Sequence, residues 1–230
     1  MAFPTTRWTY IRQAAAAPNA ESRAALEELC RHYGDPVLAF VTRRVASRET
    51  AEDLTQEFFA RLIRGDLLAK ANPDRGQFRA FLLNAVRDFL ADAHDHAKAQ
   101  KRGGDVRHFS LTTTVIVEPM THLSADQEFD VRWARTVLQR SLDRLQEEHL
   151  NGRSAVFDAL KGSLDASDRM NGRDLAMTLG MSEGAVRVTL HRMRQRLGQL
   201  IREEIAETVP SGTDIDDEIL NLRKTLEGSQ

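Results

Sequence analysis

Basic side chains gather on one stretch near the C-terminal end of this 230-residue chain, between Gly172 and Ile201. If the stretch is helical, one side of it carries Arg187, His191 and Arg194, with Arg192 and Arg196 nearby. Glu183 alone opposes them at the start of the expected helix. Arginine binds phosphate oxygens and guanine edges, so such a helix suits the major groove of DNA. Ser182, Glu183 and Arg187 would then lie nearest the bases.

Two helices joined by a tight turn are needed to position these side chains. Gly180 suits a left-handed residue that closes the first helix, and Ser182 is a good N-cap for the second. Met181 and Val186 have the spacing of a hydrophobic staple. The second helix has an apolar residue at every third or fourth position: Val186, Leu190, Met193, Leu197 and Ile201. This periodicity predicts one buried stripe and a helix-turn-helix.

A solvated surface explains the same arginines without any ligand, because the outer face of an amphipathic helix is usually charged. The tight turn favours DNA binding over that alternative. The sequence SEGAVRVTLHRMRQRL also resembles the last DNA-binding helices of bacterial RNA polymerase sigma factors, especially those of the extracytoplasmic-function (ECF) group. Helix-turn-helix units occur in many regulators, so a second match is needed to choose among them.

A second informative stretch, Ser47 to Ile63, has an acidic face and an apolar face. Thr50 followed by Asp53 has the form of a capping box, so we expect a helix to begin at Thr50. The apolar face carries Leu54, Phe58, Phe59, Leu62 and Ile63. The other face carries Glu49, Glu52, Asp53, Gln56 and Glu57. Acids in a first turn also favour the helix dipole without any partner, and that alternative stays open.

The segment AEDLTQEFF is similar to the helix of ECF sigma factors that binds the polymerase clamp. The resemblance implies that the acidic face meets basic coiled-coil helices of the largest core subunit. Thr50 stands where the family commonly has Asp, and Thr55 stands where it often has an apolar residue. Because Ser/Thr kinases switch some relatives, both threonines are candidate phosphosites. The alternative for Thr50 is a simple N-cap, and a helical wheel places Thr55 on the apolar side.

A third stretch, Gln77 to about Ala99, has the periodicity of one long helix that follows a loop from Asp66 to Gly76. Its sequence, FRAFLLNAVRDFLADAHDHAKAQKR, resembles the sigma-factor helix that opens and reads the minus-ten promoter element. The resemblance assigns DNA contacts to Arg79, Asn84, Arg87, Lys98, Lys101 and Arg102. It also places the loop from Lys70 to Gln77 where the family holds a flipped base.

Two acids and two histidines partly replace the arginines usual at the end of that helix: Asp92, His94, Asp95 and His96. Asp92 and His96 are one helical turn apart, and His94-Asp95 is the dipeptide of metal-dependent phosphohydrolases, so a metal-dependent enzyme is a further hypothesis. The remaining histidines stand in no recognisable ligand motif. Cys30 and His32 are two residues apart and point to different faces of a helix, which disfavours a nucleophilic pair. We expect no catalytic residue, no metal and no cofactor.

Composition limits the remaining classes of protein. A chain of this length with 41% hydrophobic residues can form one large or two small domains with real cores. The net charge of −2 conceals basic clusters in the helix-turn-helix and around Lys98 to Arg107. One cysteine excludes an intramolecular disulfide and a multi-cysteine zinc site. The absence of a long apolar run or a secretion signal predicts a cytoplasmic protein without membrane insertion.

The order of these stretches predicts an all-α fold of two helical domains joined by a flexible linker. We expect residues 1–102 to form the first domain, 103–125 the linker, 126–209 the helix-turn-helix domain and 210–230 a C-terminal tail. Further expected helices cover 5–17, 21–33, 37–44, 126–149, 155–164 and 215–226. Gly34, Asp35 and Pro36 are expected to separate the second and third of these, and the simplest role for the tail helix is to pack on the body.

Together the matches lie in sigma-factor order and cover most of residues 21–205. The chain is identified as a member of the sigma-70 superfamily, in the ECF group. The resemblance implies a factor that recruits core RNA polymerase to promoter DNA, melts the minus-ten element and reads the minus-thirty-five element. Many relatives are regulated by an anti-sigma factor and some by a Ser/Thr kinase. The alternative is a helix-turn-helix regulator that does not join polymerase, and binding to core polymerase separates the two.

Overall fold

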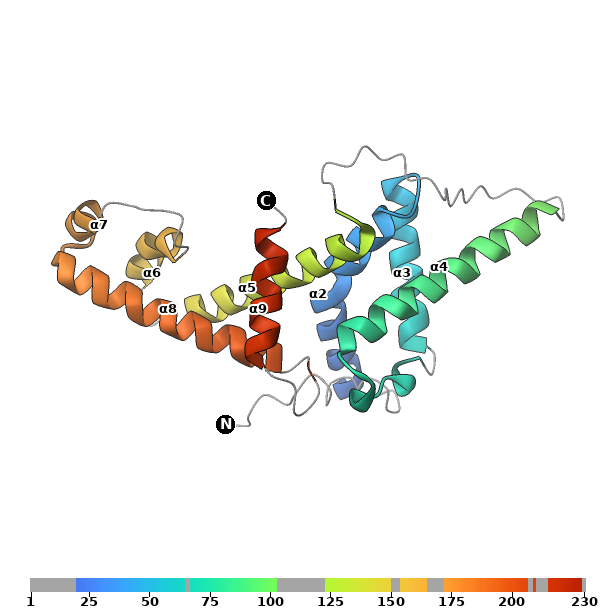
Figure 1. Cartoon of the computed structure of the whole chain (residues 1–230), viewed down its shortest axis with the longest axis horizontal. Coiled ribbons are helices and arrows are strands. Elements are labelled where there is room, and N and C mark those ends of the chain that lie inside the picture. The colour runs from blue at the N-terminus through green and yellow to red at the C-terminus, as the bar shows by residue number, and fades with distance from the viewer. Residues whose placement is uncertain are drawn as a thin grey trace. The chain divides into compact units, whose positions relative to one another are not determined.

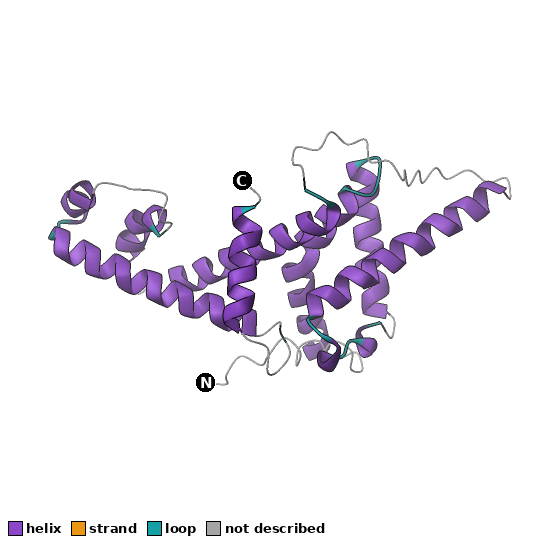
Figure 2. Ribbon diagram, viewed as in Figure 1, coloured by secondary structure: helices purple, strands orange, loops and turns teal. Residues whose placement is uncertain are grey.

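The computed structural model describes residues 20–64, 67–102, 123–149, 154–164, 172–206, 209 and 215–228. Within these residues the secondary structure is helical, without a strand (Figure 2). The chain divides into two compact units. The first contains the described residues up to Thr136 and from Ala206 onward, and the second is Val137–Ile205. The predicted all-α class is confirmed, whereas the expected linker and the N-terminal helix lie almost entirely outside the described residues.

Three long helices form the body of the first unit: α2 (Ala20–Thr42), α3 (Arg48–Arg64) and α4 (Phe78–Arg102) (Figure 1). Aromatic side chains connect their buried faces. The ring centroids of Tyr33 and Phe78 are 5.3 Å apart, and those of Phe58 and Phe89 are 5.6 Å apart. Edge-to-face contacts of this kind stabilise a core beyond the area that they bury. α4 therefore packs against both α2 and α3.

One continuous helix, α2, replaces the two helices that the sequence predicted before Arg44. It runs through Gly34 and Pro36 without a break. A proline inside a helix removes a backbone donor and crowds the preceding turn, at a cost of about 3 kcal/mol. Burial outweighs that cost, since Tyr33, Val37 and Phe40 are all buried on the same helix. The predicted stop at Pro36 was wrong because local propensity yields to this shared core.

Two short 3₁₀ turns, η1 (Leu68–Lys70) and η2 (Pro73–Arg75), lie in the segment predicted as a loop. After α4, the next helix in the described part of the chain is α5 (Ala125–His149). Its start is a reciprocal capping box. The hydroxyl of Ser124 accepts the N–H of Gln127 at 3.2 Å, and Oε1 of Gln127 accepts the N–H of Ser124 at 2.8 Å. The boundary between the two units falls inside α5.

The C-terminal helix α9 (Ile215–Glu227) belongs to the first unit. The predicted amphipathic tail helix is therefore present, with Leu222 buried on its inner face. Glu218 is also buried, although it is an acid. The helix packs on the body of its unit instead of standing free.

The second unit contains the C-terminal part of α5 together with α6 (Ser154–Leu160), η3 (Lys161–Ser163), α7 (Gly172–Leu179) and most of α8 (Glu183–Ala206). One apolar core holds it together. The buried members of this core are Leu145, Phe157, Leu160, Leu175, Ala176, Val186, Met193 and Leu200. Leu190 and Leu197 pack against it, so the apolar stripe predicted on the second helix faces the core.

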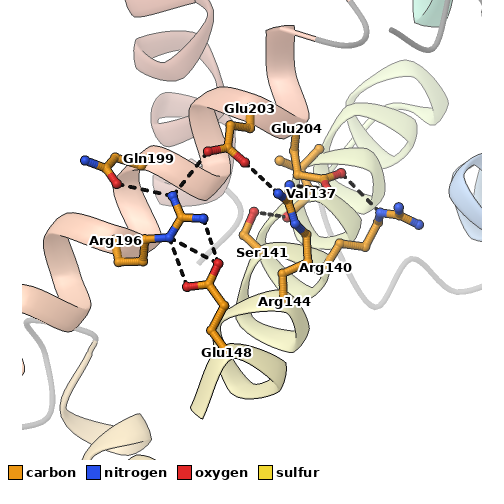
Figure 3. A network of polar contacts seen from close by, with 9 residues as sticks. All are labelled: Val137, Arg140, Ser141, Arg144, Glu148, Arg196, Gln199, Glu203 and Glu204. Atoms are coloured by element: carbon orange, nitrogen blue, oxygen red, sulfur yellow. Dashed lines mark hydrogen bonds and ion pairs between the residues drawn. The ribbon is translucent and has the colours of Figure 1, made fainter. Parts of the chain in front are cut away.

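A buried carboxylate joins α5 to α8 beside this core (Figure 3). The side chain of Glu204 is only 3% exposed. Its two oxygens accept hydrogen bonds from Arg140 and Arg144, each at 3.1 Å. Burying a charge costs several kcal/mol, and two guanidinium groups offset that cost when both carboxylate oxygens are occupied.

A second carboxylate pairing lies in the same network. Arg196 donates to both oxygens of Glu148 and also to Glu203 (Figure 3). Hydrogen bonds from Arg196 hold the pKa of the Glu148 carboxyl below its ordinary value, despite the opposite effect of partial burial. The same bonds raise the pKa of the Arg196 guanidinium. α5 and α8 are therefore joined at two points by arginine–carboxylate pairs.

We expect Glu204→Gln to lower the free energy of unfolding of the second unit by about 2 kcal/mol, because two arginines lose their buried anion. Urea unfolding followed by far-ultraviolet circular dichroism measures the change. Glu203→Gln is the matched control. Its side chain is 44% exposed, so it should cost less than about 1 kcal/mol. Equal losses in the two variants would contradict the role of burial.

The pKa of Glu148 leads to a pH-dependent stability. A carboxyl whose pKa is lower in the folded state stabilises the fold above its unfolded pKa, and this contribution is lost as the pH falls through the folded pKa. We therefore expect the free energy of unfolding to decline between about pH 5 and pH 3. The decline should be smaller in Glu148→Gln and unchanged in Glu147→Gln, which alters an exposed neighbour. Urea unfolding at a series of pH values tests this difference.

Candidate nucleic-acid interface

The turn between α7 and α8 closes as the sequence predicted. Gly180 has a φ of +62°, a left-handed conformation that glycine adopts without the steric cost of a Cβ atom. The N–H of Met181 donates to the carbonyl of Ala176 at 3.0 Å, and the N–H of Gly180 donates to the carbonyl of Met177 at 3.3 Å. These two bonds are those of a Schellman motif, which ends α7 and redirects the chain.

Ser182 is the N-cap of α8, also as predicted. Its hydroxyl accepts the N–H of Ala185 at 3.2 Å, and its carbonyl accepts the N–H of Val186 at 3.0 Å. Val186 and Met193 anchor the inner side of the helix in the core. Because the cap and the buried stripe determine where α8 begins and how it is rotated, its other side faces solvent.

The exposed side of α8 is basic. The side chains of Arg187, His191 and Arg192 are exposed, and no ion pair or hydrogen bond engages them within the described part of the chain. Glu183 is exposed in the first turn. Arg194 differs, because its Nη2 donates to the carbonyl of Ser163 at 2.7 Å and so connects η3 to α8. Three unpaired basic side chains are therefore available to a phosphate backbone.

α3 carries its acids on the side opposite its apolar residues. The exposed members of the predicted polymerase-binding set are Glu49, Asp53, Gln56 and Glu57, and Glu52 is half-buried. Glu52 accepts a hydrogen bond from Nε of Arg48 at 2.8 Å. Leu54 and Phe58 are buried on the opposite side. The five predicted side chains thus share one largely open surface, and its partner stays a prediction.

The start of α3 differs from the prediction. The helix begins at Arg48, and Ser47 is its cap, with its Oγ accepting the N–H of Thr50 at 3.1 Å. The hydroxyl of Thr50 lies 2.8 Å from Ser47 Oγ. The predicted capping box at Thr50 was therefore wrong, because an earlier serine caps the same helix. Thr50 is half-buried in the first turn, whereas Thr55 is 9% exposed on the apolar side.

Arg79 at the start of α4 is held within the first unit. Its side chain is 19% exposed and pairs with Glu218 of α9, which is 4% exposed. The guanidinium lies 4.2 Å from the ring centroid of Trp133 and 3.9 Å from a carboxylate oxygen of Asp130. Gln77 donates to the same Glu218 carboxylate at 2.9 Å. The cluster connects α4 with α5 and α9 and leaves Arg79 little access to a ligand.

The other predicted DNA contacts of α4 are distributed along the helix. Arg87 donates to Oδ1 of Asn84 at 2.8 Å and pairs with Asp126 at 2.7 Å. Lys98 is exposed. Lys101 and Arg102 belong to the helix, but their side chains lie outside the described residues. The structure thus brings Asn84 and Arg87 together, and DNA binding by this set stays a prediction.

Other kinds of site find little support among the described residues. No three histidine, cysteine or carboxylate side chains in that part of the chain converge as a metal site requires. Asp92, which the hydrolase hypothesis used, pairs instead with Arg61 at 3.1 Å. Burial raises the pKa of the Cys30 thiol, as does the nearby Glu27, which disfavours a reactive thiolate. None of the described helices has the length and apolar character needed to cross a membrane.

Comparison with known proteins finds a sigma-factor domain and two sigma-factor relatives. The model of sigma-70 region 2 matches residues 29–102. The chain is 28% identical over 185 residues to the ECF RNA polymerase sigma factor SigE of Mycolicibacterium smegmatis, a match that covers 80% of this chain and 65% of SigE. It is 27% identical over 179 residues to the RNA polymerase sigma factor YlaC of Bacillus subtilis, with 76% of this chain and 91% of YlaC covered. The chain therefore contains a match to sigma-70 region 2 and is similar to RNA polymerase sigma factors, one of them named as an ECF factor.

The residues that match region 2 comprise most of α2 together with α3 and α4. The acidic surface of α3 and the predicted DNA contacts of α4 all fall within that match. The match of the family model ends before α7 and α8, so the interpretation of the helix-turn-helix rests on its own geometry. The chain spans just under two thirds of the length of SigE. No solved structure matches it significantly.

Sequence reasoning missed the acids that engage the arginines of region 2. Asp126, Asp130 and Glu218 supply those carboxylates, from α5 and α9. One signal was present in the sequence, because Glu218 lies three residues after Ile215 and four before Leu222. An acid on the apolar side of an amphipathic helix requires a buried partner. The spacing of residues in the sequence does not identify that partner.

We expect Glu218→Gln to lower the free energy of unfolding of the first unit by about 2 to 3 kcal/mol, since Arg79 is left largely buried without its anion. Differential scanning calorimetry is suitable because it separates the transitions of two units. Asp217→Asn, at an exposed neighbour, serves as the control. A transition that shifts equally in both variants would show that the buried pair has no special role.

Proposed function

We propose that this chain is a sigma factor that recruits core RNA polymerase to specific promoters and supports DNA-templated transcription initiation. The observation that carries the proposal is the region 2 match over residues 29–102. Two proteins named as RNA polymerase sigma factors match three quarters or more of the chain, which supports it further. The proposal assigns no catalytic group and no cofactor to the chain. It places the protein in the cytoplasm, where polymerase and promoter DNA meet.

In this proposal the acidic surface of α3 binds the polymerase. Charge complementarity speeds encounter and orients partners, and an open row of carboxylates provides it. The residues concerned are Glu49, Glu52, Asp53, Gln56 and Glu57. Residues 1–102 would thus perform polymerase binding and minus-ten recognition, with residues 126–209 reading the minus-thirty-five element.

DNA contacts divide between α4 and α8. In α4 we assign them to Asn84, Arg87, Lys98, Lys101 and Arg102, and in α8 to Ser182, Glu183, Arg187, His191, Arg192 and Arg194. Arg79 receives a different role, because Glu218 and Trp133 enclose it. We assign it to positioning the start of α4. Phosphate contacts release counterions, so promoter affinity should fall as salt rises.

A plain helix-turn-helix regulator that binds DNA without polymerase is the second candidate. The exposed basic side of α8 suits both functions equally well. The acidic surface of α3 favours the sigma factor, because DNA repels carboxylates and a second, protein partner accounts for them. Binding to core polymerase distinguishes the two candidates.

We expect the double variant Asp53→Lys, Glu57→Lys to bind core RNA polymerase at least about tenfold more weakly, because repulsion replaces attraction at the interface. Both side chains are exposed and the reversal breaks no ion pair within the described residues. Co-purification and fluorescence anisotropy measure binding, and run-off transcription measures initiation. Glu147→Lys with Asp217→Lys is the control with the same charge change on exposed residues elsewhere.

Absence of core binding by both the wild-type chain and Thr50→Asp would reject the sigma factor and leave the plain regulator.

Regulation by an anti-sigma factor or a Ser/Thr kinase is also part of the proposal. A phosphate on Thr50 would add negative charge in the first turn of α3, close to Glu49 and Asp53. Thr55 is the weaker candidate, because a kinase requires an accessible hydroxyl. Thr50→Asp in the same binding assay tests this regulation.

A further inference from the structure

Val188 is a large apolar side chain that the fold leaves in solvent, with 51% of its surface exposed. It lies in the second turn of α8. A helix turns about 100° per residue, so Val188 lies about 160° around the axis from Val186. Val186 is in the core together with Met193 and Leu200. Val188 therefore cannot enter the core while that buried stripe determines the rotation of α8.

Gly184, one turn earlier, leaves Val188 uncovered. Side chains of a helix lean towards its N-terminus, so the methyl groups of Val188 lie over the Gly184 position. A Cβ atom at Gly184 would meet nothing nearer than Oγ of Ser182 at 4.0 Å. Glycine weakens a helix relative to alanine, and neither crowding nor a left-handed φ requires it here. Neither packing nor backbone conformation requires this glycine, and its missing side chain leaves room for a ligand to approach α8 closely.

Basic side chains surround this apolar spot. Arg187 is adjacent to Val188 in the chain, and His191 and Arg192 follow one turn later on the same side of α8. All three are exposed and unpaired within the described residues. The surface therefore combines exposed basic side chains with one exposed apolar side chain beside a position that lacks a Cβ atom, and we call the pair Gly184 and Val188 the notch. A ligand complementary to this surface is anionic and carries a small apolar group.

We propose that the notch formed by Gly184 and Val188 receives the 5-methyl group of a thymine in the major groove, which makes Val188 a specificity-determining residue for the upstream promoter element. The thymine methyl is the apolar group that base edges present in that groove. His191 and Arg192 hold the flanking phosphates. The inference rests on the proposed function and adds to it the base that this side chain selects.

The test uses the full chain assembled with core RNA polymerase. Duplexes randomised in the upstream element are selected for binding, and each selected thymine is then replaced by deoxyuridine, which lacks only the methyl group. At one position we expect the replacement to weaken binding about three- to fivefold, as the loss of one buried methyl contact predicts. Anisotropy titrations of the paired duplexes give this ratio directly.

Two variants test whether the notch causes the difference in affinity between thymine and deoxyuridine duplexes. Val188→Ser removes both methyl groups of the side chain, so it should bind thymine and deoxyuridine duplexes equally at that position. Gly184→Ala should also abolish the ratio, because its methyl group fills the notch while it favours the helix. Gly198→Ala is the matched control in the same helix, since its Cβ also points into open space. It should keep the wild-type ratio.

A wild-type chain that binds thymine and deoxyuridine duplexes equally at every selected position would overturn the inference. So would a Val188→Ser variant that keeps the full ratio. If Val188→Ser instead loses affinity for core polymerase with the ratio unchanged, Val188 contacts a protein and the inference is also overturned. Initiation from a selected promoter would still support the proposed function in each of these cases. A chain that selects no sequence and directs no initiation refutes both.

Discussion

The rotation of α8 about its own axis is the constraint on which the candidate DNA-binding surface depends. Val186, Met193 and Leu200 bury one side of the helix, and the Ser182 cap determines its first residue. A rotation by a single residue, about 100°, would carry Arg187 towards the core and expose Val186. The exposed arginines thus follow from apolar packing on the opposite side. The buried side of α8 stabilises the fold, and the opposite side of the same helix is exposed for recognition.

Each of the two units contains a buried glutamate that pairs with arginine. Glu204 in the second unit accepts from Arg140 and Arg144, and Glu218 in the first pairs with Arg79. Each carboxylate is nearly inaccessible to water, and desolvation removes much of what the ion pair contributes. Their stronger effect is on specificity, because a shifted helix would leave a charge buried and unpaired. We regard both glutamates as residues that select one register of helix packing.

These pairings also change how the basic residues should be counted. Arg79, Arg194 and Arg196 bind groups of the chain itself, whereas Arg187, His191 and Arg192 remain unpaired within the described residues. A basic residue in a promising stretch is therefore not yet a DNA contact. On α8, the candidate surface for nucleic acid is therefore smaller than the basic cluster in the sequence, and its unpaired members lie in the first turns of the helix.

The sequence alone determined the features that depend on neighbours along the chain. The long helices α4, α5 and α8 follow from periodicity, and the turn at Gly180 follows from glycine at a left-handed position and a serine cap. The acidic side of α3 was equally readable, because a helix places residues three and four apart on one face. Local chemistry suffices for each of these.

Only the tertiary structure decided those features in which long-range burial competes with local conformational preference. Pro36 predicted a break, but the shared core of Tyr33, Val37 and Phe40 keeps α2 continuous. The sequence could not predict the partners of the region 2 arginines either. Glu218, which pairs with Arg79, also accepts a hydrogen bond from Gln77, 141 residues away in the chain. No spacing rule connects such positions. Their pairing arises because the packing of helices places them together, and it is this packing that decides which charges remain for a ligand.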